Sequence, residues 1–170
     1  MKTGAYPEAI KEYSIALDSM PDNDIAREGL TAATKAPTIK EQGSYYQVKK
    51  MDKFNSRRQD YSPMLFGDQY NQLYFTSTRN EAQGDEISGI TGVKPGDIFV
   101  SEKDEKGKWG IPHAIESGLN SEADEGTPAF SVDGREMYIT QCLTDPTYPR
   151  FAQISVSSRA DAAWGKPKKL

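Results

Sequence analysis

The sequence predicts an α+β fold in which a short helical hairpin is followed by antiparallel β-sheet units. Through residues 4–35, small and apolar residues recur at spacings of three and four, as on one stripe of a helix. From Tyr45 onward, short aromatic and β-branched runs are separated by Gly, Pro, Asn and Asp, as in strands joined by turns. The segment "DYSPMLFGDQYNQLYFT" (60–76) returns in altered form as "DEGTPAFSVDGREMYIT" (124–140), which predicts a structural repeat.

Composition limits the class of protein and its partners. The 170 residues suit one domain, or one domain with a short appendage. A net charge of −4, without a cluster of Lys and Arg, argues against nucleic acid and anionic membrane surfaces as partners. Cys142 is the single cysteine, so an internal disulfide and a cysteine-based metal site are excluded. No run approaches the roughly 20 apolar residues of a membrane span, and no apolar signal segment follows Met1.

The helical segment is expected to form two helices. The first has Pro7 in its opening turn and Pro21 just after its end. The second is capped by Asp22 or Asn23 and ends before Pro37. We expect the following residues to be buried in the first helix: Ala9, Tyr13, Ala16 and Leu17. In the second helix the inward residues are expected to be Ile25, Ala26, Leu30 and Ala33.

The first helix resembles the second helix of a tetratricopeptide repeat. The pattern G-x-Y-x-E-A-I-x-x-Y-x-x-A-L-x-x-x-P is matched by Gly4, Tyr6, Glu8, Ala9, Ile10, Tyr13, Ala16, Leu17 and Pro21. A generic amphipathic hairpin is the alternative. The match begins in the middle of a repeat, and one such unit cannot bury its face alone. The resemblance therefore implies that residues 1–36 end an array of helices, and that the chain is a fragment of a longer protein.

The β region contains two copies of a four-stranded unit. Ser62-Pro63 matches Thr127-Pro128, and "LYFT" at 73–76 matches "MYIT" at 137–140. Further along, "WGIP" at 109–112 matches "WGKP" at 164–167 with a shorter offset, because the insertion at 79–96 belongs to one copy only. A binding role and a plain connecting role both stay open for this insertion. Two such units, each near 55 residues, predict two blades of an incomplete, open β-propeller.

Particular residues within each unit have expected positions. Asp133-Gly134 should form a two-residue hairpin turn between the first and second strands of its unit. Tyr74 and Tyr138 should be equivalent residues of inner strands that adjacent blades cover on both sides. Trp109 and Trp164 should begin the outermost strands and wedge between blades, where large aromatic side chains bury much surface.

The unit resembles the WD40-like (PD40-type) propeller repeat of bacterial envelope proteins. Residues that match its S-P-x-x-S-x-D-G-x-x-[IM]-Y-F-[ST]-S-x-R pattern in the second copy are Thr127, Pro128, Phe130, Ser131, Asp133, Gly134, Met137, Tyr138 and Thr140. Those that match in the first copy, including its G-x-D-I-[FY] strand, are Ser62, Pro63, Gly67, Leu73, Tyr74, Phe75, Ser77, Arg79, Asp97, Ile98 and Phe99. The second copy departs from the pattern after Thr140 and lacks the Arg.

The resemblance implies a domain order and a cellular role. The order is a TPR-like segment (1–36), a linker with a first strand (37–60), one blade (61–118) and a truncated second blade (119–170). It is similar to Bacteroidetes periplasmic proteins that continue into an OmpA-like domain, some of them serving the type IX secretion system. The implied protein is a periplasmic, outer-membrane-associated scaffold whose export signal lies upstream of this chain. Other envelope proteins would be its partners, and peptidoglycan would be bound only through domains absent here.

Candidate chemistry is sparse, so we predict no enzyme activity, no cofactor and no metal site. His113, the single histidine, falls at an exposed rim position, and "GxSxG" is absent. "SEADEG" (121–126) gathers carboxylates, which we interpret as residues of a solvated turn that cap backbone N–H groups rather than as Ca²⁺ ligands. The candidate interaction surface comprises Tyr45, Tyr46, Arg79, Glu122, Asp124 and Glu125. The alternative function is part of a propeller-containing glycosidase or peptidase whose active site lies outside this chain.

Overall fold

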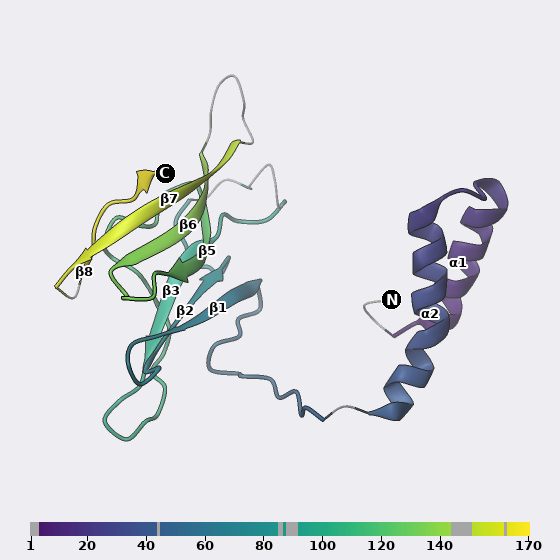
Figure 1. Ribbon diagram of the computed structural model, residues 1–170, viewed down its shortest axis with the longest axis horizontal. Helices are drawn as coiled ribbons and strands as arrows, with labels where there is room; N and C mark the ends of the chain where they lie inside the picture. Colours follow the sequence, from purple (N-terminus) through teal and green to yellow (C-terminus); the bar gives the residue numbers. More distant parts are fainter. Residues whose placement is uncertain (1–3, 44, 85–86, 88–91, 144–150, 162) are drawn as a thin grey trace. The chain divides into compact units, whose positions relative to one another are not determined.

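The computed structural model describes residues 4–43, 45–84, 87, 92–143, 151–161 and 163–170. The chain forms two compact units, Met1–Lys49 and Lys50–Leu170. The first unit holds two helices, and the second holds two antiparallel sheets (Figure 1). The predicted α+β class is therefore confirmed. Neither helix combines the length and the apolar character that crossing a bilayer requires, within the part of the chain that the structure describes.

The helical unit is a hairpin of α1 (Tyr6–Ser19) and α2 (Asp24–Gln42) (Figure 1). A proline in the first turn of α1 costs no hydrogen bond, because the first N–H groups of a helix have no partner within it. Asn23 caps α2, since its Oδ1 accepts a hydrogen bond from the Ala26 N–H at 3.0 Å. The expected hairpin and the Asn23 cap are confirmed.

Three details of the helix prediction are wrong. The residues of α1 that were expected to be buried are only half-buried, namely Ala9, Tyr13, Ala16 and Leu17. α2 continues through Pro37 to Gln42, because a proline removes one backbone N–H donor but the turns on either side keep theirs. Ile25 is 81% exposed, and Ala26 and Ala33 are the buried residues of α2. These two alanines lie seven residues apart and so share one face of the helix.

Gly29 makes a specific contact that predicts an unusual response to mutation. A Cβ at this helical position would overlap the ring of Tyr13. Gly29→Ala, which usually stabilises a helix by about 1 kcal/mol, is therefore expected to destabilise the hairpin by about 1 kcal/mol. Thermal melting followed by circular dichroism measures this effect. In a Tyr13→Ala background the same change should become stabilising; an unchanged sign there would contradict the proposed contact.

The second unit contains two sheets in chain order. The first is β1 (Asp60–Phe66), β2 (Gln72–Ser77), β3 (Asp97–Glu102) and β4 (His113–Ala114). The second is β5 (Asp124–Phe130), β6 (Glu136–Leu143), β7 (Phe151–Ala160) and β8 (Ala163–Trp164), with β9 (Lys168–Lys169) also paired to β7. The expected strand at 45–50 is not formed, and Tyr45 is fully exposed there.

The two sheets repeat each other in register. The pair Met64–Tyr74 of β1 and β2 corresponds to Ala129–Tyr138 of β5 and β6. Both first strands carry a bulge two residues before this pair, with Ser62 at φ 51° and Thr127 at φ 52°. Positive φ is uncommon for residues with a side chain. Its recurrence at equivalent positions shows that the two sheets are copies of one unit.

The outermost strands are also equivalent. Val100–His113 in the first sheet corresponds to Val156–Lys168 in the second, so β9 occupies the place of β4. The expected truncation of the second sheet is therefore not seen at this strand. The turn between β5 and β6 also differs from the prediction: Asp133 has no positive φ, and the connection is a longer loop closed by the Ser131 N–H and the Glu136 carbonyl at 3.0 Å.

The main core is a seam between the two sheets. Its buried residues are Phe66, Tyr74, Ile98, Val100, Ile115, Leu119, Met137, Ile139 and Trp164, with Phe130 packed against them. The indole Nε1 of Trp164 donates to the Tyr74 hydroxyl at 3.2 Å, so this tryptophan packs between the two sheets. Trp109 instead contacts Phe54, which precedes β1. The expectation that β6 is covered on both sides is wrong, because Tyr138 and Thr140 on its other face are half-exposed.

Candidate binding groove on the first sheet

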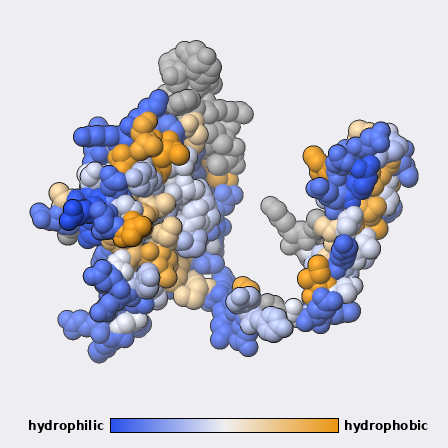
Figure 2. Space-filling model, in the orientation of Figure 1, coloured by the Kyte–Doolittle hydropathy of each residue, from blue (hydrophilic) through white to orange (hydrophobic). Residues whose placement is uncertain are grey.

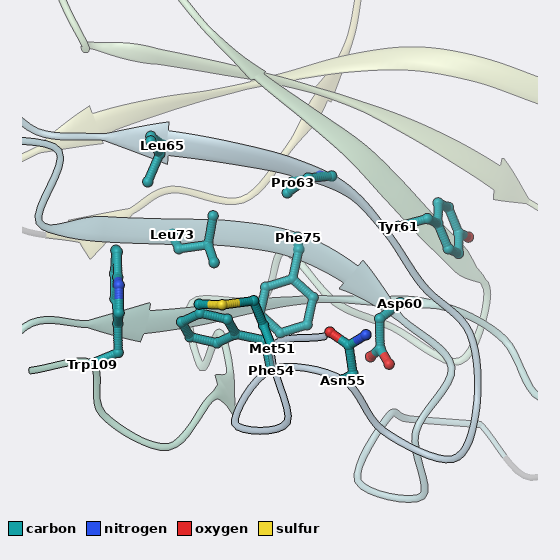
Figure 3. A pocket seen from close by; sticks show the side chains of 10 residues that line it. All are labelled: Met51, Phe54, Asn55, Asp60, Tyr61, Pro63, Leu65, Leu73, Phe75 and Trp109. Carbon is teal, nitrogen blue, oxygen red and sulfur yellow. The ribbon is translucent and has the colours of Figure 1, made fainter. Parts of the chain in front are cut away.

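The first sheet carries an apolar groove on the face that points away from the seam. Its volume is about 470 Å³, within the range of roughly 300–1,000 Å³ typical of ligand sites. Leu65 and Leu73 project into it from β1 and β2, and Trp109 stands at one end (Figure 3). The remaining lining residues are Met51, Phe54, Asn55, Asp60, Tyr61, Pro63 and Phe75.

One wall of the groove is formed by residues 51–59, which we call the covering segment. Phe54 is buried and meets Phe75 and Trp109 edge to face, at centroid distances of 6.5 and 5.4 Å. Such pairs contribute about 0.5–1.5 kcal/mol beyond the area they bury. The Lys53 ammonium also donates to the Trp109 carbonyl. The covering segment thus shields Phe75 and leaves Leu65, 48% exposed, open to solvent.

Arg79 fastens the covering segment to the sheet. Its Nη2 donates to the Phe54 carbonyl at 2.6 Å and to Asp60 Oδ1 at 2.8 Å. The guanidinium lies over the rings of Phe75 and Phe99, 5.1 and 4.8 Å from their centroids. Both partners of the ion pair are only 12% exposed. Burial and full pairing make this a structural ion pair rather than a contact surface.

Asp60 has all its oxygens engaged. Its Oδ2 accepts from the backbone N–H and hydroxyl of Ser56 at 2.6 and 2.9 Å, and its Oδ1 also accepts from Ser77 at 2.7 Å. Burial alone would raise the pKa of Asp60, but the hydrogen bonds from Ser77, Arg79 and Ser56 together lower it. The carboxylate is therefore held ionised and has no free lone pair aimed into the groove.

Glu125 occupies the position of Asp60 in the second sheet, but no Lys or Arg of the described residues forms an ion pair with it. The N–H and hydroxyl of Ser121 donate to its carboxylate at 2.9 and 2.6 Å, as those of Ser56 do to Asp60. The place of Arg79 is taken by Leu143 in the second copy. Burial raises the pKa of Glu125, although the hydrogen bonds from Ser121 and Gln141 oppose the shift. Glu125 therefore caps a backbone N–H as expected, but the expected solvated turn is wrong for this residue, because Glu125 is buried within β5.

A second buried acid lies close to this cap. Asp97 begins β3 and is fully buried. Its Oδ2 accepts from the Gln83 N–H at 2.8 Å, and its Oδ1 has no hydrogen-bond partner among the residues that the structure describes. Burial raises the pKa of Asp97 to about 6, and the nearby charge of Glu125 adds to the shift. Asp124 bonds the Gly96 N–H at 2.8 Å and so ties the start of β5 to the start of β3.

The residues predicted as an interaction surface do not form one patch. Tyr45 and Glu122 are exposed, whereas Glu125 is buried and Arg79 is nearly so. The surface role expected for Arg79 and Glu125 is therefore wrong, because hydrogen bonds within the fold occupy both side chains. His113 is exposed at the sheet rim, as expected, and Cys142 is half-buried near the end of β6.

The groove and its covering segment were missed at the sequence level, although a signal exists. The repeat extends upstream of the aligned strands, since Ser56 and Asp60 have the same spacing as Ser121 and Glu125. A serine four residues before a carboxylate at the start of both first strands indicates a repeated cap. The burial of Phe54 would then follow from its place beside this cap.

The groove is suited to an apolar side chain or ligand rather than to bond-breaking chemistry. Its one carboxylate, Asp60, is committed to Ser56, Ser77 and Arg79. Across the described residues, no three His, Cys, Asp or Glu side chains gather so that they could hold a metal ion. Comparisons with protein-family models, with curated proteins and with solved structures find no match for this chain.

Proposed function

We propose that the chain is a non-catalytic binding module of a cell-envelope scaffold, built from a TPR-like hairpin and two blades of a β-propeller. The observation that carries this proposal is the stacking of two sheets of equivalent pairing register across the seam sealed by Tyr74 and Trp164. Repeated units of this kind offer extended surfaces for partners without chemistry of their own. The motif order, with the helical hairpin before the sheets, supports a periplasmic, outer-membrane-associated protein that assists type IX secretion or peptidoglycan anchoring.

Partner binding can be tested in cells that produce the whole protein. A photo-crosslinking phenylalanine derivative in place of the exposed Tyr45 is expected to capture envelope proteins, found in the periplasmic and outer-membrane fractions. The same derivative in place of Lys106, exposed in the loop before β4, serves as the control position. Crosslinks to cytosolic proteins, or recovery of the whole protein from the cytosol, would contradict the proposed location.

The second candidate is part of a propeller-containing hydrolase, and the buried acids Asp97 and Glu125 are the observation that favours it. Raised carboxyl pKa values occur at catalytic sites as well as in structural cores. We expect no turnover of model glycosides or peptides by this chain, because both carboxyl groups are sealed from solvent. Saturable hydrolysis that Glu125→Gln abolishes would favour the hydrolase instead.

A further inference from the structure

The seam joins two different faces of the same repeated sheet. The tyrosine face of the first sheet, so named for Tyr74, presents Tyr74, Ile98 and Val100. The tryptophan face of the second sheet, which packs against it, presents Phe130, Met137, Ile139 and Trp164. Because the two sheets share one register, each sheet has both kinds of face. The chain therefore leaves one tyrosine face and one tryptophan face outside the seam.

The tyrosine face of the second sheet is uncovered among the described residues. It presents Tyr138, Ile154 and Val156, the equivalents of Tyr74, Ile98 and Val100. Ile154 is 56% exposed, whereas Ile98 is fully buried. Figure 2 shows apolar surface over this part of β6 and β7. Ile154 is exposed beside the half-buried Tyr138 and Val156, and such apolar side chains on one sheet face are typical of a surface that packs against another element.

The tryptophan face of the first sheet is the groove described above. Leu65, Leu73, Phe75 and Trp109 are the equivalents of Phe130, Met137, Ile139 and Trp164. In the seam, Phe130 packs against Phe66 and Tyr74 at centroid distances of 4.3 and 5.0 Å. In the groove, Leu65 stays half-exposed, while the covering segment shields Phe75.

We propose that a second copy of this chain docks head to tail, with its tyrosine face in the groove of the first. The seam supplies the reason for this choice of occupant, because it already pairs these two kinds of face within one molecule. Tyr138 of one copy would then lie beside Leu65 and Trp109 of the other. Its hydroxyl would accept from the Trp109 Nε1, as the Tyr74 hydroxyl accepts from Trp164 at 3.2 Å in the seam.

Such an interface is heterologous, since it joins two different surfaces. Each docked copy leaves one groove and one tyrosine face open, so association continues beyond the dimer unless a ring closes. The net charge of −4 on each copy opposes contact. At about 0.15 M salt, charges more than about 8 Å apart are largely screened. Association is therefore expected to strengthen as salt is added, because burial of apolar surface drives it.

The test blocks each face separately in the 170-residue chain. Leu65→Glu places a charge in the groove, and Ile154→Glu places one on the tyrosine face. Both sites are exposed, so the fold should tolerate them, and Ile111→Glu at an 82% exposed position outside both faces is the matched control. Analytical ultracentrifugation over a range of concentrations at 0.15 M salt measures association, and circular dichroism verifies folding.

Wild type and the Ile111→Glu control are expected to exceed 18.9 kDa progressively with concentration, and each single-face variant should associate at least about tenfold more weakly. A mixture of the two variants should form a one-to-one dimer and nothing larger, because it contains one intact groove and one intact tyrosine face. A wild-type chain that stays monomeric throughout, or variants that associate as wild type does, would overturn the proposal. A mixture that fails to form the dimer would overturn it as well.

Discussion

Replacing Arg79 by methionine is expected to lower the free energy of unfolding of the sheet unit by about 3–5 kcal/mol. The change leaves the Asp60 carboxylate buried without its cation and removes the donor to the Phe54 carbonyl. It also removes the cation from the rings of Phe75 and Phe99. Urea denaturation followed by tryptophan fluorescence measures the loss, because Trp109 reports on the covering segment and Trp164 on the seam.

Arg159→Met is the matched control for the loss of a cation near aromatic rings. The Arg159 guanidinium lies 5.2 and 5.6 Å from the ring centroids of Phe66 and Trp164. It has no ion pair of the kind that Arg79 makes with Asp60 among the described residues. We therefore expect this variant to cost about 1 kcal/mol. If the two variants lost equal stability, the ion pair would not be the main cause of the Arg79 effect.

A double-mutant cycle separates the ion pair from the other contacts of Arg79. Asp60→Asn and Arg79→Met are expected to show a coupling free energy between about 0.5 and 3 kcal/mol.

The pH dependence of stability supplies a second check on the ion pair. Because the pKa of Asp60 is lowered on folding, the stability from this group is present above its unfolded pKa of 3.8 and is lost as the pH falls through the folded pKa. Arg79→Met should weaken this sensitivity to acid.

The repeat was predictable from sequence because its bulges and strand positions require particular residue types at fixed spacings. Ser62-Pro63 and Thr127-Pro128 mark the two bulges, and Trp109 and Trp164 each lie four residues before an outermost strand, β4 and β9. The pairing registers reproduce the sequence offsets, including the shorter offset after the insertion. The antiparallel pairing and the equivalence of Tyr74 and Tyr138 therefore followed from local spacing alone.

Burial was harder to predict, because it depends on residues that come from elsewhere in the chain. Arg79 is charged and follows a strand, which is typical of a surface residue, yet the covering segment and Asp60 enclose it. The segment at 45–50 has the alternation of a strand, but a strand also needs a paired edge, and none forms there. The alternation shows that the segment could form a strand, but it does not supply the neighbouring strand with which to pair. The extension of α2 through Pro37 is a similar case, since propensity sets a cost but does not forbid the helix.

Asp97→Asn is expected to change how the stability of the sheet unit depends on pH. The pKa of Asp97 rises from 3.8 in the unfolded chain to about 6 in the folded one. Folding therefore favours the protonated form of Asp97. The stability that this group contributes is greatest below pH 3.8 and is lost as the pH rises through about 6. At 1.36 kcal/mol for each pKa unit, ionisation of this group costs the folded state about 3 kcal/mol by pH 7. The raised pKa of Glu125 acts in the same direction.

The asparagine variant keeps an acceptor for the Gln83 N–H and carries no charge. The NH₂ group of the asparagine takes the place of Oδ1, which has no partner among the described residues. The free energy of unfolding at pH 7 should therefore rise by about 1–2 kcal/mol, which is less than the full cost of ionisation. Urea midpoints measured between pH 4 and pH 8 should fall less steeply for Asp97→Asn than for wild type. Asp68→Asn, on the exposed loop between β1 and β2, should leave the slope unchanged. Equal slopes for wild type and Asp97→Asn would mean that Asp97 ionises in the folded state as easily as in the unfolded chain. In that case the buried Asp97 carboxylate would need stabilisation beyond the hydrogen bond from the Gln83 N–H.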